Sequence, residues 1–188
     1  NSVNITLSTT DPAVTVINNS AVITIINPSQ FLSIPTPFTF QVANNITDQH
    51  VVVFNIDMID NLSNTWSSTI NVLLNAPVLD HTTFTIDDAV LGNGNGKLDA
   101  GETLDLVVDV TNIGHADITN LTATLGCLSS YVTVNSTTSN VASLAVNGQQ
   151  STIFNISINA NTPVGTLAQF PFDLTDGVYS HNNTFSQT

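Results

Sequence analysis

Apolar and polar residues alternate along much of this chain, and the two-residue period constrains its fold more than any other feature. In residues 103–111 every second residue from Leu104 to Val110 is apolar. The same alternation recurs at 38–42, 154–158 and 170–174. Successive side chains of a strand point to opposite faces, so this period predicts antiparallel strands with one buried and one solvated side. No window of eleven or more residues keeps a helical apolar spacing between helix caps, and we expect almost no helix.

The chain also contains an internal repeat. At an offset of 118 residues, segment 6–7 matches segment 124–125 and segment 14–16 matches segment 132–134. After a slip of two residues, 38–42 matches 154–158 and 54–60 matches 170–176 at an offset of 116. This period is about the length of one β-sandwich domain. The sequence therefore predicts an all-β protein of two tandem antiparallel β-sandwich domains.

The repeat sets the expected domain boundaries at 1–76 and 77–188, with the junction at Asn75-Ala76-Pro77. Pro77 removes a hydrogen-bond donor where the strand pattern stops. Asn1 aligns with Thr119, so the first copy lacks the counterpart of residues 77–118 and hence its N-terminal strands. We expect open sheet edges there, with apolar positions exposed along residues 3–7, at Val3, Ile5 and Leu7.

An incomplete sandwich implies that something covers it. Either the chain is a fragment of a longer tandem protein, or neighbouring chains or adjacent repeats supply strands through a homo-oligomeric, head-to-tail contact that need not close. We expect a fragment or a filament subunit rather than a free monomer.

Short oxygen-bearing side chains and glycines concentrate in residues 87–102, which fit a calcium loop when Gly96 takes the turn position. The first ligand position then falls on Leu91, so a preceding aspartate must supply that carboxylate. The candidate ligands are Asp87, Asp88, Asn93, Asn95, Lys97 through its carbonyl, Asp99 and Glu102. The alternative interpretation is a tight glycine loop whose Asn and Asp residues only favour turns. Both interpretations stay open at this point.

Composition excludes several kinds of partner. The formal charge is −13 and Lys97 is the only basic residue, so nucleic acids and anionic membrane surfaces are poor partners. Apolar runs are far shorter than the roughly 18 residues that a spanning helix needs, and we expect no membrane insertion. Cys127 is the only cysteine, which excludes an intrachain disulfide, and we expect it to be a small core residue.

No catalytic constellation is apparent, and we expect no enzyme activity. The four histidines show no paired ligand spacing, and we interpret them as structural or exposed: His50, His81, His115 and His181. The acidic pairs at 57 and 60 and at 173 and 176 recur at matching strand ends. Solvated strand ends are therefore a better interpretation of these pairs than an acid and a base.

Residues 87–88, the run Gly-Asn-Gly-Asn-Gly-Lys-Leu-Asp-Ala-Gly-Glu-Thr-Leu-Asp-Leu at 92–106, and Val-Thr-Asn-Ile-Gly-His-Ala-Asp at 110–117 carry a resemblance. They resemble immunoglobulin-like repeats that follow the catalytic domain of secreted gingipain-like and subtilisin-like bacterial peptidases and that occur in bacterial surface proteins. The resemblance implies that the two tandem antiparallel β-sandwich domains are immunoglobulin-like and that their location is extracellular or at the cell surface. That family more often has aspartate where Asn93 and Asn95 stand here. None of its catalytic motifs is present.

Three functions follow as hypotheses. The first is a non-catalytic extracellular structural repeat, serving as a stalk, spacer or filament subunit and stabilised by calcium. The second is a set of accessory C-terminal domains of a secreted peptidase. The third is a carbohydrate or surface adhesion module that uses exposed aromatic residues, for which the candidates are Trp66, Tyr131 and Tyr179.

Overall fold

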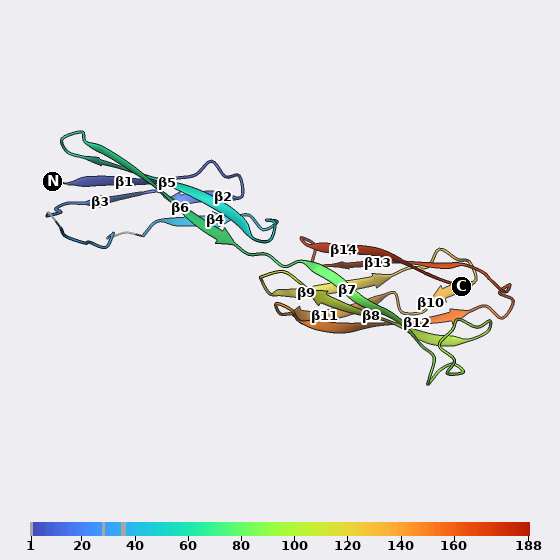
Figure 1. Cartoon of the computed structure of the whole chain (residues 1–188). Coiled ribbons are helices and arrows are strands. Elements are labelled where there is room, and N and C mark those ends of the chain that lie inside the picture. The colour runs from blue at the N-terminus through green and yellow to red at the C-terminus, as the bar shows by residue number, and fades with distance from the viewer. Residues whose placement is uncertain (1, 28, 35–36) are drawn as a thin grey trace. The chain divides into compact units, whose positions relative to one another are not determined.

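The computed structural model describes residues 2–27, 29–34 and 37–188, and these residues form strands and no helix (Figure 1). All strand pairs are antiparallel, and the strands form three four-stranded sheets and one two-stranded sheet. The prediction of an all-β, antiparallel, sandwich-type fold is confirmed. Within the described residues, no helix is long and apolar enough to cross a membrane. The chain divides into two compact units, one within residues 1–75 and the other within residues 76–188.

The described residues of the first unit form six strands. They are β1 (Val3–Ser8), β2 (Val14–Asn18), β3 (Ser20–Ile23), β4 (Thr39–Val42), β5 (His50–Asp60) and β6 (Thr65–Leu74). One sheet has the order β3-β1-β5-β6, and the other contains β2 and β4 alone among the described strands. A small buried cluster lies between them, formed by Leu7, Val14, Val52 and Phe54.

The second unit contains eight strands. They are β7 (Leu79–Asp87), β8 (Thr103–Asn112), β9 (Ile118–Leu125), β10 (Val132–Val134), β11 (Thr138–Leu144), β12 (Gln149–Ile158), β13 (Ala168–Thr175) and β14 (Ser180–Gln187). The sheet orders are β10-β12-β8-β7 and β11-β9-β13-β14. Seven of these strands contribute buried side chains to one core, and β10 adds half-buried Val132 and Val134.

Strand alternation places the core residues of the second unit as the sequence predicts. On β8, the side chains of Leu104, Leu106, Val108 and Val110 have no exposed surface. The strand at 38–42 behaves differently, because only residues 39–42 pair and the side chain of Phe40 is 37% exposed. A two-residue period therefore predicts which face a side chain occupies, whereas the neighbouring strands determine whether that face is covered.

The expected exposure of residues 3–7 is wrong for two of the three apolar positions. Ile5 and Leu7 are each only 6% exposed. β1 pairs with β3 on one side and with β5 on the other, so it is an inner strand of its sheet. The uncovered apolar side chains lie elsewhere in this unit, and they include Phe40 on β4 and Ile70 on β6.

Six strands of each unit pair in the same way. Val3 pairs with Ile23 on β1 and β3, and Leu121 pairs with Val141 on β9 and β11. The pair Leu7 and Ile56 on β1 and β5 corresponds to Leu125 and Phe172 on β9 and β13. The pair Val14 and Val42 on β2 and β4 corresponds to Val132 and Ile158 on β10 and β12. These partners stand at the sequence offsets of 118 and 116 residues. The described part of the first unit has no counterpart of β7 and β8.

Candidate functional site

The 87–102 segment connects β7 to β8 and is ordered by one buried carboxylate. Asp88 is 3% exposed, and its Oδ2 accepts hydrogen bonds from the backbone N–H groups of Asn95 (2.8 Å) and Gly96 (3.0 Å). Gly96 has a φ of 72°, a left-handed conformation that favours glycine. A Cβ at Gly92 would collide with the carboxylate of Glu102. The glycines therefore allow the loop to fold closely over Asp88.

Two further carboxylates face the same loop. Asp99 Oδ2 accepts hydrogen bonds from the side-chain amides of Asn93 (2.8 Å) and Asn95 (2.6 Å), and these amides lower the pKa of Asp99. Glu102 Oε1 accepts from the backbone N–H of Asn93 at 2.7 Å, and its Oε2 accepts from the N–H of Asp99 at 3.3 Å. A single hydrogen-bond network thus joins both asparagines to three acidic residues.

The structure brings five of the seven predicted ligands into this network, and the other two lie at its margin. The backbone N–H of Lys97 donates to Asn95 Oδ1 at 2.8 Å. Asp87 Oδ1 accepts only a local bond from the N–H of Ala89, at 3.3 Å. Of the two preceding aspartates, Asp88 is the one that folds under the loop.

The network has features of both interpretations of the loop. The side-chain oxygens of Asn93 and Asn95 accept backbone bonds two residues ahead, which is the turn chemistry of asparagine. The carboxylates of Asp88, Asp99 and Glu102 are the hard oxygen donors that calcium prefers. They now accept N–H groups and do not bring three donor atoms within 4.8 Å of one another. Calcium binding would require them to turn toward the ion, and it remains a prediction.

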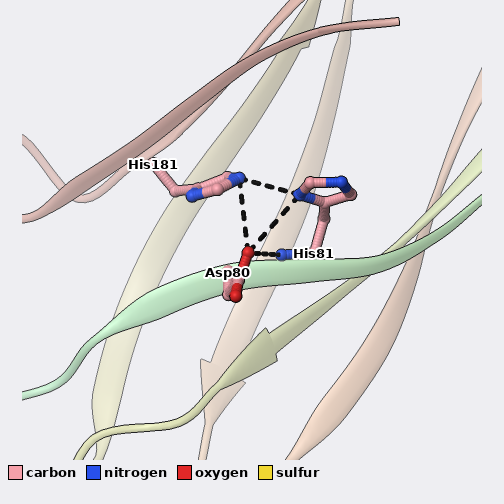
Figure 2. A group of neighbouring side chains, drawn as sticks. All are labelled: Asp80, His81 and His181. Atoms are coloured by element: carbon pink, nitrogen blue, oxygen red, sulfur yellow. Dashed lines mark hydrogen bonds and ion pairs between the residues drawn. The ribbon is translucent and has the colours of Figure 1, made fainter.

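A second cluster joins strands that are far apart in sequence (Figure 2). Asp80 and His81 lie on β7, and His181 lies on β14. His81 Nδ1 is 2.9 Å from His181 Nε2 and 3.5 Å from Asp80 Oδ1. The distance between Asp80 Oδ1 and His181 Nε2 is 3.7 Å. Within the described residues, no other group of three His, Cys, Asp or Glu side chains brings its ligand atoms so close together.

The surroundings of this cluster hold the His81 ring in place. His81 Nε2 is 3.0 Å from the Asn183 side-chain nitrogen, and the His81 ring meets the Phe185 ring edge-on with centroids 5.2 Å apart. Burial lowers the pKa of His181, although the Asp80 carboxylate opposes this effect. Because the histidines are 100 residues apart, their spacing in the sequence gives no sign of the contact. Only the facing edges of two sheets bring them together.

The acidic residues at the strand ends have a structural role that sequence analysis missed. Asp60 is 9% exposed, so its interpretation as solvated is wrong. Its Oδ1 accepts from the backbone N–H groups of Leu62 and Asn64, at 2.9 and 2.8 Å. Asp176 Oδ1 accepts from the N–H groups two and three residues ahead, both at 2.8 Å. Both aspartates order a hairpin turn.

The remaining single residues are distributed over both units. Cys127 is half-buried against the second core, and burial raises the pKa of its thiol. Trp66 is 51% exposed on β6 and lines a hollow of about 410 Å³ together with Asp57. Tyr131 and Tyr179 belong to the second unit, and Tyr179 packs in part against its core.

The sequence matches no protein-family model, and no curated protein matches it significantly. The resemblance of residues 87–117 to immunoglobulin-like repeats therefore remains a prediction.

Proposed function

We propose that this chain is a non-catalytic extracellular structural repeat, a stalk, spacer or filament subunit built from two versions of one immunoglobulin-like sandwich. The shared strand pairing of the two units is the observation that supports this proposal most. Units that repeat one pairing scheme along a chain add length and surface, as in other repeat proteins. A surface rich in Asn, Thr and Ser, with a single basic residue in the chain, suits a module outside the cell.

Completion of the first unit is the second part of the proposal. Phe40 corresponds to Ile156 at the offset of 116, and their exposed fractions are 37% and 0%. Ile70 pairs with Phe54 as Phe185 pairs with Phe170, and the exposed fractions of Ile70 and Phe185 are 48% and 9%. Positions that are covered in one unit are therefore open in the other.

The second unit shows what covers these positions. Ile156 on β12 pairs with Leu104 on β8, so β8 extends that sheet beyond β12. Phe185 is covered from β7, where the Phe84 ring stacks on it with centroids 4.3 Å apart. We propose that a two-stranded hairpin patterned like β7 and β8 fills the same place in the first unit. A strand added in this way is held by backbone hydrogen bonds and by apolar contacts of every second side chain.

A fusion that supplies this hairpin tests the proposal. The offset of 118 places Ile118 immediately before the position of Asn1, so residues 77–118 are duplicated directly ahead of Asn1. Trp66 is the only tryptophan and lies in the first unit, so its fluorescence reports unfolding of that unit alone. Covering Phe40 and Ile70 should add at least ~2 kcal/mol, which raises the midpoint of thermal unfolding by roughly 8–16 °C.

The control is the same fusion with the duplicated β8 made polar at its four buried positions. Hydrogen exchange of the β4 amides should slow in the first fusion and stay fast in the control. Equal midpoints and equal exchange in both fusions would contradict the hairpin proposal. A separate peptide covering 77–112 tests supply from a neighbouring chain, since a shift at high peptide concentration shows that a covalent link is unnecessary.

Electron microscopy of the unfused chain tests the structural role itself. Regular fibres would support head-to-tail strand sharing between chains, and the fusion should abolish them by filling the open edge. Dispersed particles from both proteins would instead favour supply of the hairpin by an adjacent repeat of a longer chain.

Surface adhesion is a second candidate function, favoured by the exposure of Trp66. This side chain lies beside Asp57 and Thr6 at a hollow of the first unit, and an exposed aromatic face next to polar groups suits stacking against a sugar ring. Titration with soluble polysaccharides should change Trp66 fluorescence, and Asp57→Ala should weaken that response. A flat response across neutral and acidic polysaccharides would contradict adhesion at this surface.

A further inference from the structure

We infer that Asp80, His81 and His181 form a binding site for a divalent transition metal ion, with zinc as the best fit, which fastens β7 to β14. The chemistry of the donor atoms favours this class of ion. Two imidazole nitrogens and one carboxylate oxygen are common zinc ligands, whereas calcium prefers a shell of oxygens. The site lies in the second unit and does not depend on the proposed structural function.

The spacing of the three donor atoms fits one small ion. Ligands held about 2.0–2.1 Å from zinc in a tetrahedron lie about 3.3–3.4 Å from one another. The observed separations are 2.9, 3.5 and 3.7 Å, so an ion at the centre requires shifts of only a few tenths of an ångström. Figure 2 shows the two rings and the Asp80 carboxylate converging on this point.

Without an ion, one proton lies on the line between the two nitrogens, because two lone pairs do not attract each other. His81 Nδ1 is the donor when the Asn183 amide donates to His81 Nε2. Metal binding requires the other tautomer of His81, with the proton on Nε2. The Asn183 amide then turns its oxygen toward that N–H and becomes the positioning residue that many metal-bound histidines have.

The position of the site gives the ion a structural role. β7 is the end strand of the sheet β10-β12-β8-β7, and β14 is the end strand of the sheet β11-β9-β13-β14. One ion bound to both strands links the two sheets along this edge. The Asp80 side chain is 43% exposed, which leaves room for water as a fourth ligand. The register of β7 is irregular between His81 and Thr83, and such an irregularity changes the direction of the neighbouring side chains.

Cobalt substitution tests the site in the full chain after treatment with a chelator. One Co²⁺ per chain should produce the intense visible absorption of tetrahedral coordination, and one equivalent of Zn²⁺ should remove it. Zn²⁺ should also raise the unfolding midpoint of the second unit, measured as the circular dichroism transition that Trp66 fluorescence does not report. His81→Ala and His181→Ala should each weaken binding at least ~10-fold.

Two further variants separate a metal site from an ordinary hydrogen bond between histidines. His50→Ala is the matched control, because His50 pairs with Asp11 at 2.8 Å in a contact that contains one histidine and one carboxylate. It should leave Co²⁺ and Zn²⁺ binding unchanged. Asn183→Asp places a carboxylate behind His81 and should tighten metal binding, roughly 10-fold or more.

The absence of Co²⁺ absorption and of a Zn²⁺-dependent midpoint shift in the unmutated chain, at metal concentrations up to ~1 mM, would overturn the proposal. Binding that is equally strong in the His81 and His181 variants would also overturn it. If those variants fail to fold, the unmutated spectrum and the response of Asn183→Asp decide the question.

Discussion

The first and second units pair six strands alike, yet matching side chains are buried to different extents. Ile156 has no exposed surface, whereas Phe40 at the matching position is more than a third exposed. Both residues are large and apolar, and both occupy the inward positions of an alternating segment. The difference is the hairpin of β7 and β8, which borders β12 in one unit and has no counterpart beside β4 among the described strands of the other. Burial in a sandwich thus depends on neighbouring strands as much as on residue type.

Removal of the hairpin from the second unit has the largest expected effect, and it tests whether the hairpin explains the difference between the two units. Deleting residues 79–112 removes four side chains of β8 that have no exposed surface. Each contributes about 1.5–3 kcal/mol, and together they approach the whole stability of a typical domain. We expect the second unit to lose cooperative unfolding in circular dichroism, while the Trp66 signal of the first unit is unchanged. A second unit that still unfolds cooperatively would show that six strands suffice.

A matched pair of core substitutions tests the difference between the two units at single positions. Phe170 and Phe54 stand at the offset of 116, and their exposed fractions are 0% and 2%. Phe170→Ala should cost about 3–5 kcal/mol, because its tightly packed surroundings cannot collapse into the cavity. Phe54→Ala should cost less, since the neighbouring Phe40 ring, with its centroid 5.0 Å away, has a free side and can move inward.

Urea unfolding measures this pair, with Trp66 fluorescence for the first unit and, for the second, the circular dichroism transition that Trp66 fluorescence does not report. Val164→Ala is the control, because that side chain is fully exposed and its truncation should leave stability unchanged. Equal costs for the two phenylalanines would mean that the first core is as rigid as the second.

Changes to the loop between β7 and β8 have the next largest expected effect on stability. This loop belongs to the second unit. Asp88→Ala leaves the Gly96 N–H without its acceptor and the Asn95 N–H with only the longer bond to Asn93 Oδ1, and it should cost about 1–3 kcal/mol. If calcium binds with a dissociation constant near ~0.1 mM, then ~1 mM calcium adds roughly 1.4 kcal/mol by mass action. We expect calcium to raise the unfolding midpoint of the unmutated chain relative to chelator.

Two variants decide between the interpretations of this loop. Asp88→Ala should abolish the calcium response, and Asp87→Ala should keep it, because Asp87 lies outside the hydrogen-bond network. An unchanged midpoint in calcium would reject the metal interpretation and leave a tight turn ordered by Asp88.

Much of the fold was predictable because strand alternation and the repeat are local or periodic signals. Leu104 to Val110 were identified as core from their period alone. The burial of Ile5 and Leu7 was not, because periodicity does not show that β1 has a partner on each side. Similarly, the strand end at Asp60 was visible in the sequence, whereas the return of the chain over its carboxylate was not.

The candidate sites divide in the same way. The 87–102 loop was predictable because its glycines and acidic residues are close in sequence, although the choice of Asp88 over Asp87 needed three-dimensional structure. The cluster of His81 and His181 was not predictable, because its members meet only where the end strands of two sheets face each other. Side chains brought together by sheet packing carry no spacing signal.

Asp109 provides the smallest expected effect and again concerns β8. Hydrogen bonds from Ser151 on β12 and Thr83 on β7, both 2.6 Å long, lower the pKa of the Asp109 carboxyl. A lowered pKa in the folded state means that the carboxylate stabilises the fold above its unfolded pKa and that this contribution is lost as the pH falls through the folded value. The side chain lies near the surface, so the contribution is below about 1 kcal/mol.

Asp109→Asn should therefore flatten the decrease in stability of the second unit at acid pH and leave the first unit unchanged. Urea midpoints measured by circular dichroism and by Trp66 fluorescence, from neutral pH down through the ordinary range of aspartate, check both halves of this expectation. Asp109 links β8 to β7 and β12, and the described part of the first unit, which has no counterpart of β7 or β8, has no equivalent contact to lose. An identical pH profile in the unmutated chain and the Asp109→Asn variant would show that these bonds hold the neutral and ionised carboxyl equally well.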